Sequence, residues 1–115
     1  YAGETGGPDA AGINYNIPLH KGCDDTTYLE AVDQAVEKIM VFKPRWLIIS
    51  AGFDTSNMDP STNFLLSDEA YEQIGIRLAN LELPILIVQE GGYAVEKNGE
   101  LAVRLLKGLS IKVNE

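Results

Sequence analysis

The sequence predicts an α/β protein built on a small parallel sheet. Two short runs, residues 46–51 and 84–90, are almost wholly apolar, as expected of strands whose two faces are both covered. Longer segments between and beside them repeat apolar residues every three or four positions, which is typical of amphipathic helices. Because strands and helices alternate along the chain, we expect parallel strands, helical crossovers and helices on both faces of the sheet.

The first predicted elements are a strand and a helix. Residues 13–19, INYNIPL, alternate apolar and polar side chains, which predicts a half-buried strand. Pro18 places that strand at a sheet edge or a strand end, because proline cannot donate to a neighbouring strand. A helix is predicted from about residue 26 to 42, with Asp24 or Asp25 available as its N-cap.

The second half of the chain repeats this order. A strand at residues 46–51 is followed by a helix that Ser67 opens as N-cap. A strand at 84–90 then leads into a last helix at about 95–109. The two apolar strands need neighbours on both sides. We therefore expect the chain to pair with copies of itself or with further strands of a wider sheet.

Composition excludes several classes of function. The 115 residues form one domain, residues 1–115. Seventeen acidic and nine basic side chains give a net charge of −8, which disfavours nucleic acid and anionic membrane surfaces as partners. No apolar run is long enough to span a membrane, and the first ten residues lack the pattern of a signal peptide. The single cysteine, Cys23, cannot form an internal disulfide and fits a cytoplasmic protein.

Two loops that follow the apolar strands share one order: strand, glycine, functional side chain. The first, SAGFD, ends at Asp54, and the second, EGGY, ends at Tyr93. Because parallel strands end at the same edge of a sheet, we expect both side chains to project into one crevice. A carboxylate that ligates a divalent ion and a phenol that donates to an oxyanion suit metal-assisted hydrolysis. Taken alone, however, these residues favour simpler roles, Asp54 as a turn former or helix cap and Tyr93 as a packing residue.

Other candidate residues carry weaker signals. We interpret Glu90 as a buried partner of a backbone amide rather than a second metal ligand. His20, the only histidine, is expected to be a solvated loop residue, and Cys23 a small buried one. The glycine-rich residues 3–12 lack the ending of a phosphate-binding loop. Residue patterns alone therefore also permit a small doubly wound domain that binds an unidentified ligand at its strand ends.

The motifs taken together resemble a known family. SAGFD, the DP loop that follows, LLSDEAY and VQEGGY resemble the C-terminal part of the zinc-dependent histone deacetylase family. Its bacterial deacetylase and acetylpolyamine amidohydrolase branches are the nearer relatives, and the upstream ETGGPDAAGINYNIPL is also similar to the family's sequence. The resemblance covers almost the whole chain. It implies a three-layer αβα fold shared with arginases, of which this chain is a partial domain.

The resemblance also implies roles for four residues. Asp54 matches the family's aspartate ligand of zinc. Tyr93 matches the catalytic tyrosine that hydrogen-bonds the carbonyl and the oxyanion of the acetyl amide. Gly91 and Gly92 match the glycines that shape the acyl tunnel and so contact the substrate. The implied substrate is an acetylated amine, either acetyl-lysine or an acetylpolyamine.

Part of the family's site lies outside the sequence. The Asp-x-His ligands and the general-base histidines precede this region in the family, and His20 matches none of them. One carboxylate does not hold catalytic zinc, for which three protein ligands are usual. We therefore expect the chain alone to bind no zinc and to be inactive. Its start at Tyr1 instead of Met favours a fragment, completed by a missing N-terminal part or by a homo-oligomer; the alternative is a truncated, non-catalytic oligomeric binding or structural module.

Overall fold

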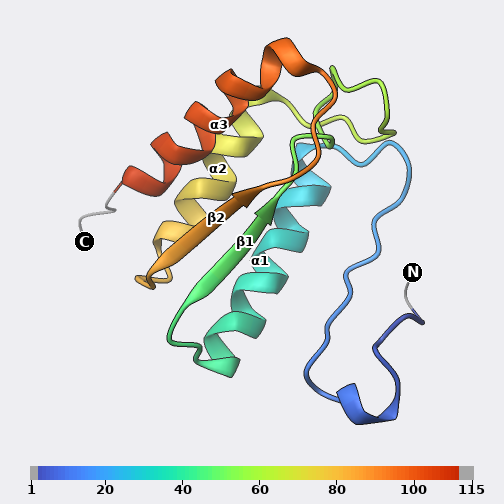
Figure 1. The fold of residues 1–115 in the computed structure, drawn as a ribbon, viewed down its shortest axis with the longest axis vertical. Helices are drawn as coiled ribbons and strands as arrows, with labels where there is room; N and C mark the ends of the chain where they lie inside the picture. Colours follow the sequence, from blue (N-terminus) through green and yellow to red (C-terminus); the bar gives the residue numbers. More distant parts are fainter. Residues whose placement is uncertain (1–2, 112–115) are drawn as a thin grey trace.

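A computed structural model describes residues 3–111 and confirms the α/β class (Figure 1). None of the helices in this range is both long and apolar enough to cross a membrane. From residue 25 onward the elements follow the predicted alternation, and a short 3₁₀ turn lies near the N-terminus. In chain order they are η1 (Pro8–Ala10), α1 (Asp25–Phe42), β1 (Leu47–Ala51), α2 (Asp68–Ala79), β2 (Ile85–Gln89) and α3 (Val95–Ser110).

The sheet is small and parallel, as predicted. β1 and β2 pair in one register that runs from Leu47 opposite Ile85 to Ala51 opposite Gln89. Parallel strands need a long crossover, and α2 supplies it. The carboxyl ends of both strands, and therefore both candidate loops, lie at the same edge (Figure 1).

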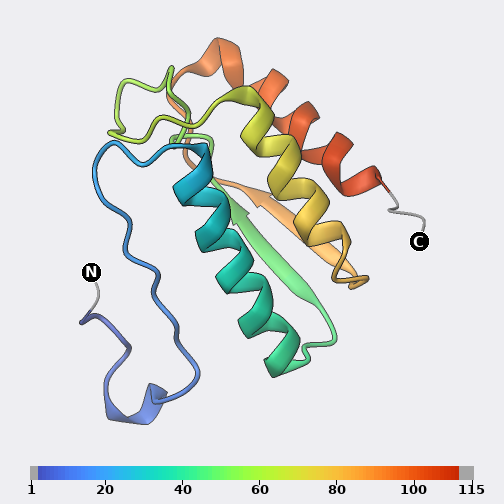
Figure 2. The same ribbon diagram turned by 180° about the vertical axis from the view of Figure 1, so that it is seen from behind.

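Within residues 3–111 the helices cover one face of the sheet. All three lie on the same side of the two strands (Figure 2). Ile49 and Ile87 pack against the core, whereas the alternate side chains Ile48 and Leu86 remain 65% and 55% exposed. The cover expected on both faces is therefore found on one, and this part of the chain supplies the sheet and one helical layer.

The strand predicted at residues 13–19 is wrong. This segment is extended but lies apart from the sheet (Figure 1), and Ile13 and Tyr15 are exposed. Lys38 lies over the Tyr15 ring, with Nζ 4.7 Å from the ring centroid, so the segment contacts α1 through side chains. Alternation indicates an extended backbone, but a strand also needs a hydrogen-bonded neighbour, and none of the described residues supplies one here.

The N-caps of α1 and α2 lie at the predicted residues, but only the cap of α1 makes the expected side-chain hydrogen bond. Asp24 caps α1, because its side chain accepts a hydrogen bond from the amide of Thr27 at 3.0 Å. Ser67 occupies the N-cap of α2, but its side chain makes no capping bond. Instead Asp25 accepts from the Ser67 amide at 2.8 Å and from its hydroxyl at 2.5 Å. The start of α2 is thus tied to the start of α1.

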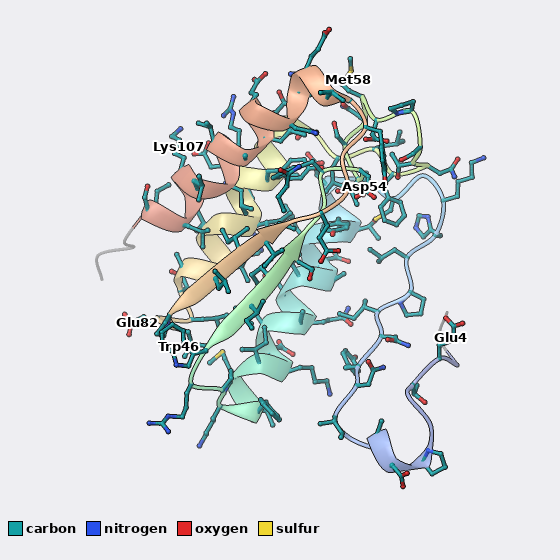
Figure 3. The ribbon with its side chains drawn as sticks, in the orientation of Figure 1. Glu4, Trp46, Asp54, Met58, Glu82 and Lys107 are labelled. Atoms are coloured by element: carbon teal, nitrogen blue, oxygen red, sulfur yellow. The ribbon has the colours of Figure 1, made fainter. Side chains whose placement is uncertain are left out.

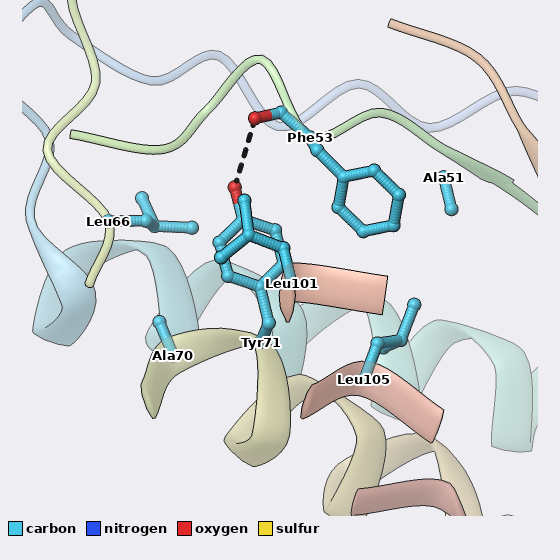
Figure 4. Packing of buried hydrophobic residues seen from close by; sticks show 7 residues of the cluster. All are labelled: Ala51, Phe53, Leu66, Ala70, Tyr71, Leu101 and Leu105. Carbon is cyan, nitrogen blue, oxygen red and sulfur yellow. Dashed lines mark hydrogen bonds between the residues drawn. The ribbon is translucent and has the colours of Figure 1, made fainter. Parts of the chain in front are cut away.

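The buried core includes Phe53 of the loop that follows β1 (Figure 4). Leu66 and Leu101 are fully buried, and the Phe53 and Tyr71 rings pack with their centroids 5.7 Å apart. Phe53 belongs to the loop after β1, and the other three come from α2, α3 and the segment before α2. Burial of this cluster therefore fixes the loop after β1 on a packed base.

Helices α2 and α3 approach one another closely enough for backbone contact. A Cβ atom at Gly108 would lie 2.1 Å from the carbonyl oxygen of Glu72, and one at Gly75 would lie 2.3 Å from that of Leu105. Glu72 also pairs with Lys107 at 3.1 Å beside this crossing. Two glycines thus set the distance between the helices.

Candidate functional site

The two candidate loops are joined by backbone hydrogen bonds beyond the end of the sheet. The Glu90 amide donates to the carbonyl of Ala51 at 3.0 Å, and the Phe53 amide donates to the carbonyl of Gly91 at 2.7 Å. The two loops therefore lie at one edge of the sheet, as predicted, and are in direct contact. These bonds fix the backbones of the two loops relative to each other.

Asp54 lies against the backbone of both loops at the carboxyl ends of the strands (Figure 3). A Cβ atom at Gly52 would lie 2.5 Å from Asp54 Oδ1, and one at Gly91 would lie 2.5 Å from Oδ2. The carboxylate therefore needs glycine at both positions. Within residues 3–111 it accepts no side-chain or backbone hydrogen bond and forms no ion pair, so Asp54 is neither a helix cap nor a turn-forming acceptor.

Tyr93 presents its side chain to solvent. It is 60% exposed, and no residue between 3 and 111 hydrogen-bonds its hydroxyl. The interpretation of Tyr93 as a packing residue is therefore wrong. Its backbone amide, in contrast, donates to Oδ2 of Asp59 at 2.6 Å, so its main chain is held while its phenol stays accessible.

Gly92, next to Tyr93, has a φ of +143°, which glycine adopts without strain. A Cβ atom there would also lie 2.7 Å from Oδ1 of Asn98, whose Nδ2 donates to the Gly92 carbonyl at 2.9 Å. The backbone geometry thus explains the glycine at this position. The substrate contacts expected of Gly91 and Gly92 remain predictions.

Asp59 is the feature of the site that sequence reasoning missed. It is 7% exposed and accepts four hydrogen bonds, from the Ser61 amide and hydroxyl at 2.8 and 2.6 Å and from the amides of Tyr93 and Ala94 at 2.6 and 3.2 Å. Burial alone would raise the pKa of Asp59, but these hydrogen bonds outweigh it and lower the pKa to about 2. The bond to Ser61 is a local turn that an Asp-Pro-Ser sequence favours, whereas the bond to Tyr93 has no local signal.

The lowered pKa of Asp59 predicts an acid-dependent loss of stability. The pKa of Asp59 falls from 3.8 in the unfolded chain to about 2 in the folded one. Ionised Asp59 therefore contributes fully to the free energy of unfolding above about pH 4, and this contribution is lost as the pH falls toward 2. Between about pH 2 and pH 4 the unfolded chain binds more protons than the folded chain. We expect Asp59→Asn to remove up to one proton from the uptake on unfolding, which urea titrations across this range measure; an unchanged pH dependence would contradict the assignment.

Tyr71 supports the loop that carries Asp54 from below. Its hydroxyl lies 2.9 Å from Oγ1 of Thr55 and donates to the carbonyl of Phe53 at 3.4 Å (Figure 4). Burial raises the pKa of Tyr71 to about 12. The hydrogen bond with Thr55 lowers the pKa, and the charge of Asp54 raises it slightly. Tyr71 is thus a neutral donor that holds the residues on both sides of Asp54.

The remaining candidates follow their predictions, with one exception. His20 is exposed in a loop, and Cys23 is fully buried, as expected. Burial raises the pKa of the Cys23 thiol, and the charge of Asp24 adds to this. The prediction for Glu90 is wrong, because its side chain is exposed where β2 ends.

Zinc is the metal that the family resemblance implies, and Asp54 fits the role of one ligand. Asp54 is half-buried, and its carboxylate is engaged by none of the described side chains. The same range holds no group of three or more histidine, cysteine, aspartate or glutamate side chains that could enclose a metal ion. Catalytic zinc needs about three protein ligands. The described residues therefore do not by themselves form a zinc site of this kind.

A cavity of about 370 Å³ lies between β2 and α3, lined by apolar side chains together with Gln89 and Asn98. Oδ1 of Asn98 is buried without a hydrogen-bond partner among the described residues. Neither Asp54 nor Tyr93 lines this cavity. Phe53, from the loop that carries Asp54, is among the residues that line it.

The fold and the site define an α/β protein with an unpartnered carboxylate and an exposed tyrosine on two joined loops at the carboxyl ends of parallel strands. Residues 1–109 match the histone deacetylase domain. The chain belongs to the histone deacetylase family.

Similar proteins agree with this assignment. The chain is 42% identical over 108 residues to acetylpolyamine amidohydrolase 1 of Pseudomonas aeruginosa, covering 94% of this chain and 31% of that protein. A solved acetylpolyamine aminohydrolase of Burkholderia pseudomallei superposes with a TM-score of 0.88 at 31% identity over 94% of this chain and 32% of the other. The HDA15 HD domain gives a TM-score of 0.85 at 29% identity, over 95% and 32%. The chain thus spans about a third of these relatives, and its neighbours share the arginase/deacetylase fold that the resemblance implied.

Proposed function

We propose that this chain provides the C-terminal part of the active site of a zinc-dependent deacylase, with Asp54 as a zinc ligand and Tyr93 as a catalytic residue. The observation that carries the proposal is the unpartnered Asp54 carboxylate, held against Gly91 in the loop that presents the exposed Tyr93 phenol. The substrate is an acetylated amine, such as an acetylpolyamine or acetyl-lysine. This choice is supported by the acetylpolyamine amidohydrolases among the relatives.

The residues of the chain divide the work in a simple way. Zinc, when bound, would polarise the acyl carbonyl and acidify a water molecule. Asp54 would be one of the residues that hold the zinc at the strand ends. Tyr93 donates a hydrogen bond to the amide oxygen as negative charge develops on it, the type of interaction whose removal costs about 10²–10³ in rate. Gly91 and Gly92 leave room for the acyl group beside that phenol.

The general base and the other ligands come from outside the described residues. The single histidine, His20, is exposed and lies in the loop before α1. One histidine cannot supply both the general base and the remaining zinc ligands. We propose that the N-terminal part of a deacetylase domain, or a second copy of the chain, completes the site, and that the chain alone is inactive. The buried, unpaired Cys23 fits a reducing cytoplasm as the location.

A chimaera tests the proposal. This chain would replace the matching segment of acetylpolyamine amidohydrolase 1 of Pseudomonas aeruginosa, and hydrolysis of an acetylpolyamine would be followed in the presence of zinc. We expect activity in the chimaera and none in the isolated chain. Asp54→Asn should abolish the activity, and Tyr93→Phe should lower it by about 10²–10³, whereas Glu37→Gln on the exposed side of α1 should leave it unchanged.

The alternative is a non-catalytic oligomeric module, which the exposed Ile48 and Leu86 on the bare sheet face would serve by self-association. A folded chimaera without activity, or activity that survives Asp54→Asn, would reject the deacylase proposal. Self-association of the isolated chain in analytical ultracentrifugation, lost on Ile48→Lys, would then favour the module.

A further inference from the structure

The chemistry proposed for Tyr93 leaves one buried charge of the site without a role. Asp59 has no part in that chemistry, yet it is buried and accepts hydrogen bonds from Ser61 and from the amide of Tyr93. One oxygen, Oδ1, is held by Ser61. The other, Oδ2, accepts from the amides of Tyr93 and Ala94. Each carboxylate oxygen therefore has its own set of donors.

This arrangement fixes the main chain of Tyr93 while its side chain is unsupported. The Tyr93 phenol is 60% exposed and has no hydrogen-bond partner among the described residues. The position of the ring therefore depends on its backbone. The bond from the Tyr93 amide to Asp59, at 2.6 Å, is short for an N–H donor, as expected when the acceptor is charged.

We propose that Asp59 is a positioning residue for Tyr93: its buried carboxylate, oriented by Ser61, holds the Tyr93 main chain at the distance from Asp54 that deacylation needs. This inference rests on the proposed catalytic role of Tyr93. Asp59 lies only five positions after Asp54 in the same loop, so one short segment carries both the ligand and the anchor of the phenol. Displacement of this segment would move both groups together.

A purely structural role for Asp59 makes different predictions. Helix α3 has Ala94 at its N-cap and no side-chain capping bond. In a purely structural role, the Asp59 carboxylate would simply stabilise the positive end of this helix. In that case its loss would weaken the whole of α3. A positioning role requires instead that the Tyr93 main chain is released while the rest of α3 keeps its protection.

Amide hydrogen exchange on the isolated chain, followed by NMR, separates these roles without any assumption about catalysis. In Asp59→Asn we expect exchange of the Tyr93 amide to accelerate at least about tenfold more than exchange of the Leu101 and Leu105 amides. This factor corresponds to the loss of one hydrogen bond to a charged group. Asp24→Asn, which removes the carboxylate cap of α1, is the matched control and should spare Tyr93. Equal acceleration along α3 would overturn the proposal. Should Asp59→Asn fail to fold, Ser61→Ala removes one support of Oδ1 and should show the same pattern more weakly.

Activity of the chimaera supplies the second readout. Asp59→Asn should lower kcat about tenfold or more with little change in KM, and this loss should vanish when Tyr93 is already phenylalanine, because the two groups act as a unit. An active chimaera in which Asp59→Asn leaves kcat unchanged, or lowers it equally in the Tyr93→Phe background, overturns the positioning role and leaves the proposed function standing. An inactive parent chimaera rejects the proposed function, while the exchange result still decides whether Asp59 holds Tyr93.

Discussion

Replacement of Gly108 by alanine is expected to destabilise the fold by about 2 kcal/mol. The new Cβ atom would lie 2.1 Å from the carbonyl oxygen of Glu72 and 3.0 Å from Cα of Gly75. Both are backbone atoms, so no side-chain rotation relieves the contact and α2 must move away from α3. Overpacking of this kind costs about 1–3 kcal/mol, and with backbone on both sides we expect the upper end. Alanine offsets about 1 kcal/mol of this through its higher helix propensity.

Urea unfolding followed by circular dichroism measures this change. Gly99 offers a matched control in the same helix, because a Cβ atom there meets no atom within 4 Å. Gly99→Ala should therefore stabilise the chain by about 0.5–1 kcal/mol. If Gly108→Ala is as stable as the wild type while Gly99→Ala behaves as expected, the close crossing of α2 and α3 is not the conformation in solution.

The helices and the two paired strands could be predicted from sequence because their signals are local. Apolar periodicity and N-caps place α1, α2 and α3 within a few residues of their observed bounds. The strand predicted at residues 13–19 failed for the opposite reason, since a strand depends on a partner that alternation does not reveal. Cover on both sheet faces failed likewise, because an apolar run indicates what a strand can bury and not what lies over it.

The candidate site divides in the same way. Asp54 and Tyr93 could be singled out because each ends a strand–glycine motif and parallel strands share an edge. The contacts that hold them could not be predicted. Asp59 reaches Tyr93 across 34 positions, and Tyr71 reaches Phe53 across 18. Such pairs arise only from the packing of α2 and α3 beneath the loops, for which a single sequence carries no local pattern.

Gly91 gives the second large effect, on activity instead of stability. In Gly91→Ala the new Cβ atom would lie 2.5 Å from Oδ2 and 2.8 Å from Cγ of Asp54. Asp54 can rotate away at its own side-chain torsions, so the fold should lose little stability. The carboxylate cannot, however, keep the orientation against both loops that we propose for a zinc ligand. We expect activity of the chimaera to fall by about 100-fold, the upper end of the range for loss of a group that orients a metal ligand.

The cause of that loss can be isolated by combining substitutions. If Gly91→Ala acts by displacing Asp54, the zinc content of the chimaera falls in parallel with its activity. The double variant Gly91→Ala/Asp54→Asn should then hold no less zinc than Asp54→Asn alone, since both changes remove the same ligand. A rise in KM with unchanged zinc content would contradict this. It would instead favour the contact with the acyl group that the family resemblance implies for Gly91, because steric blockage of a substrate tunnel weakens binding without releasing the metal.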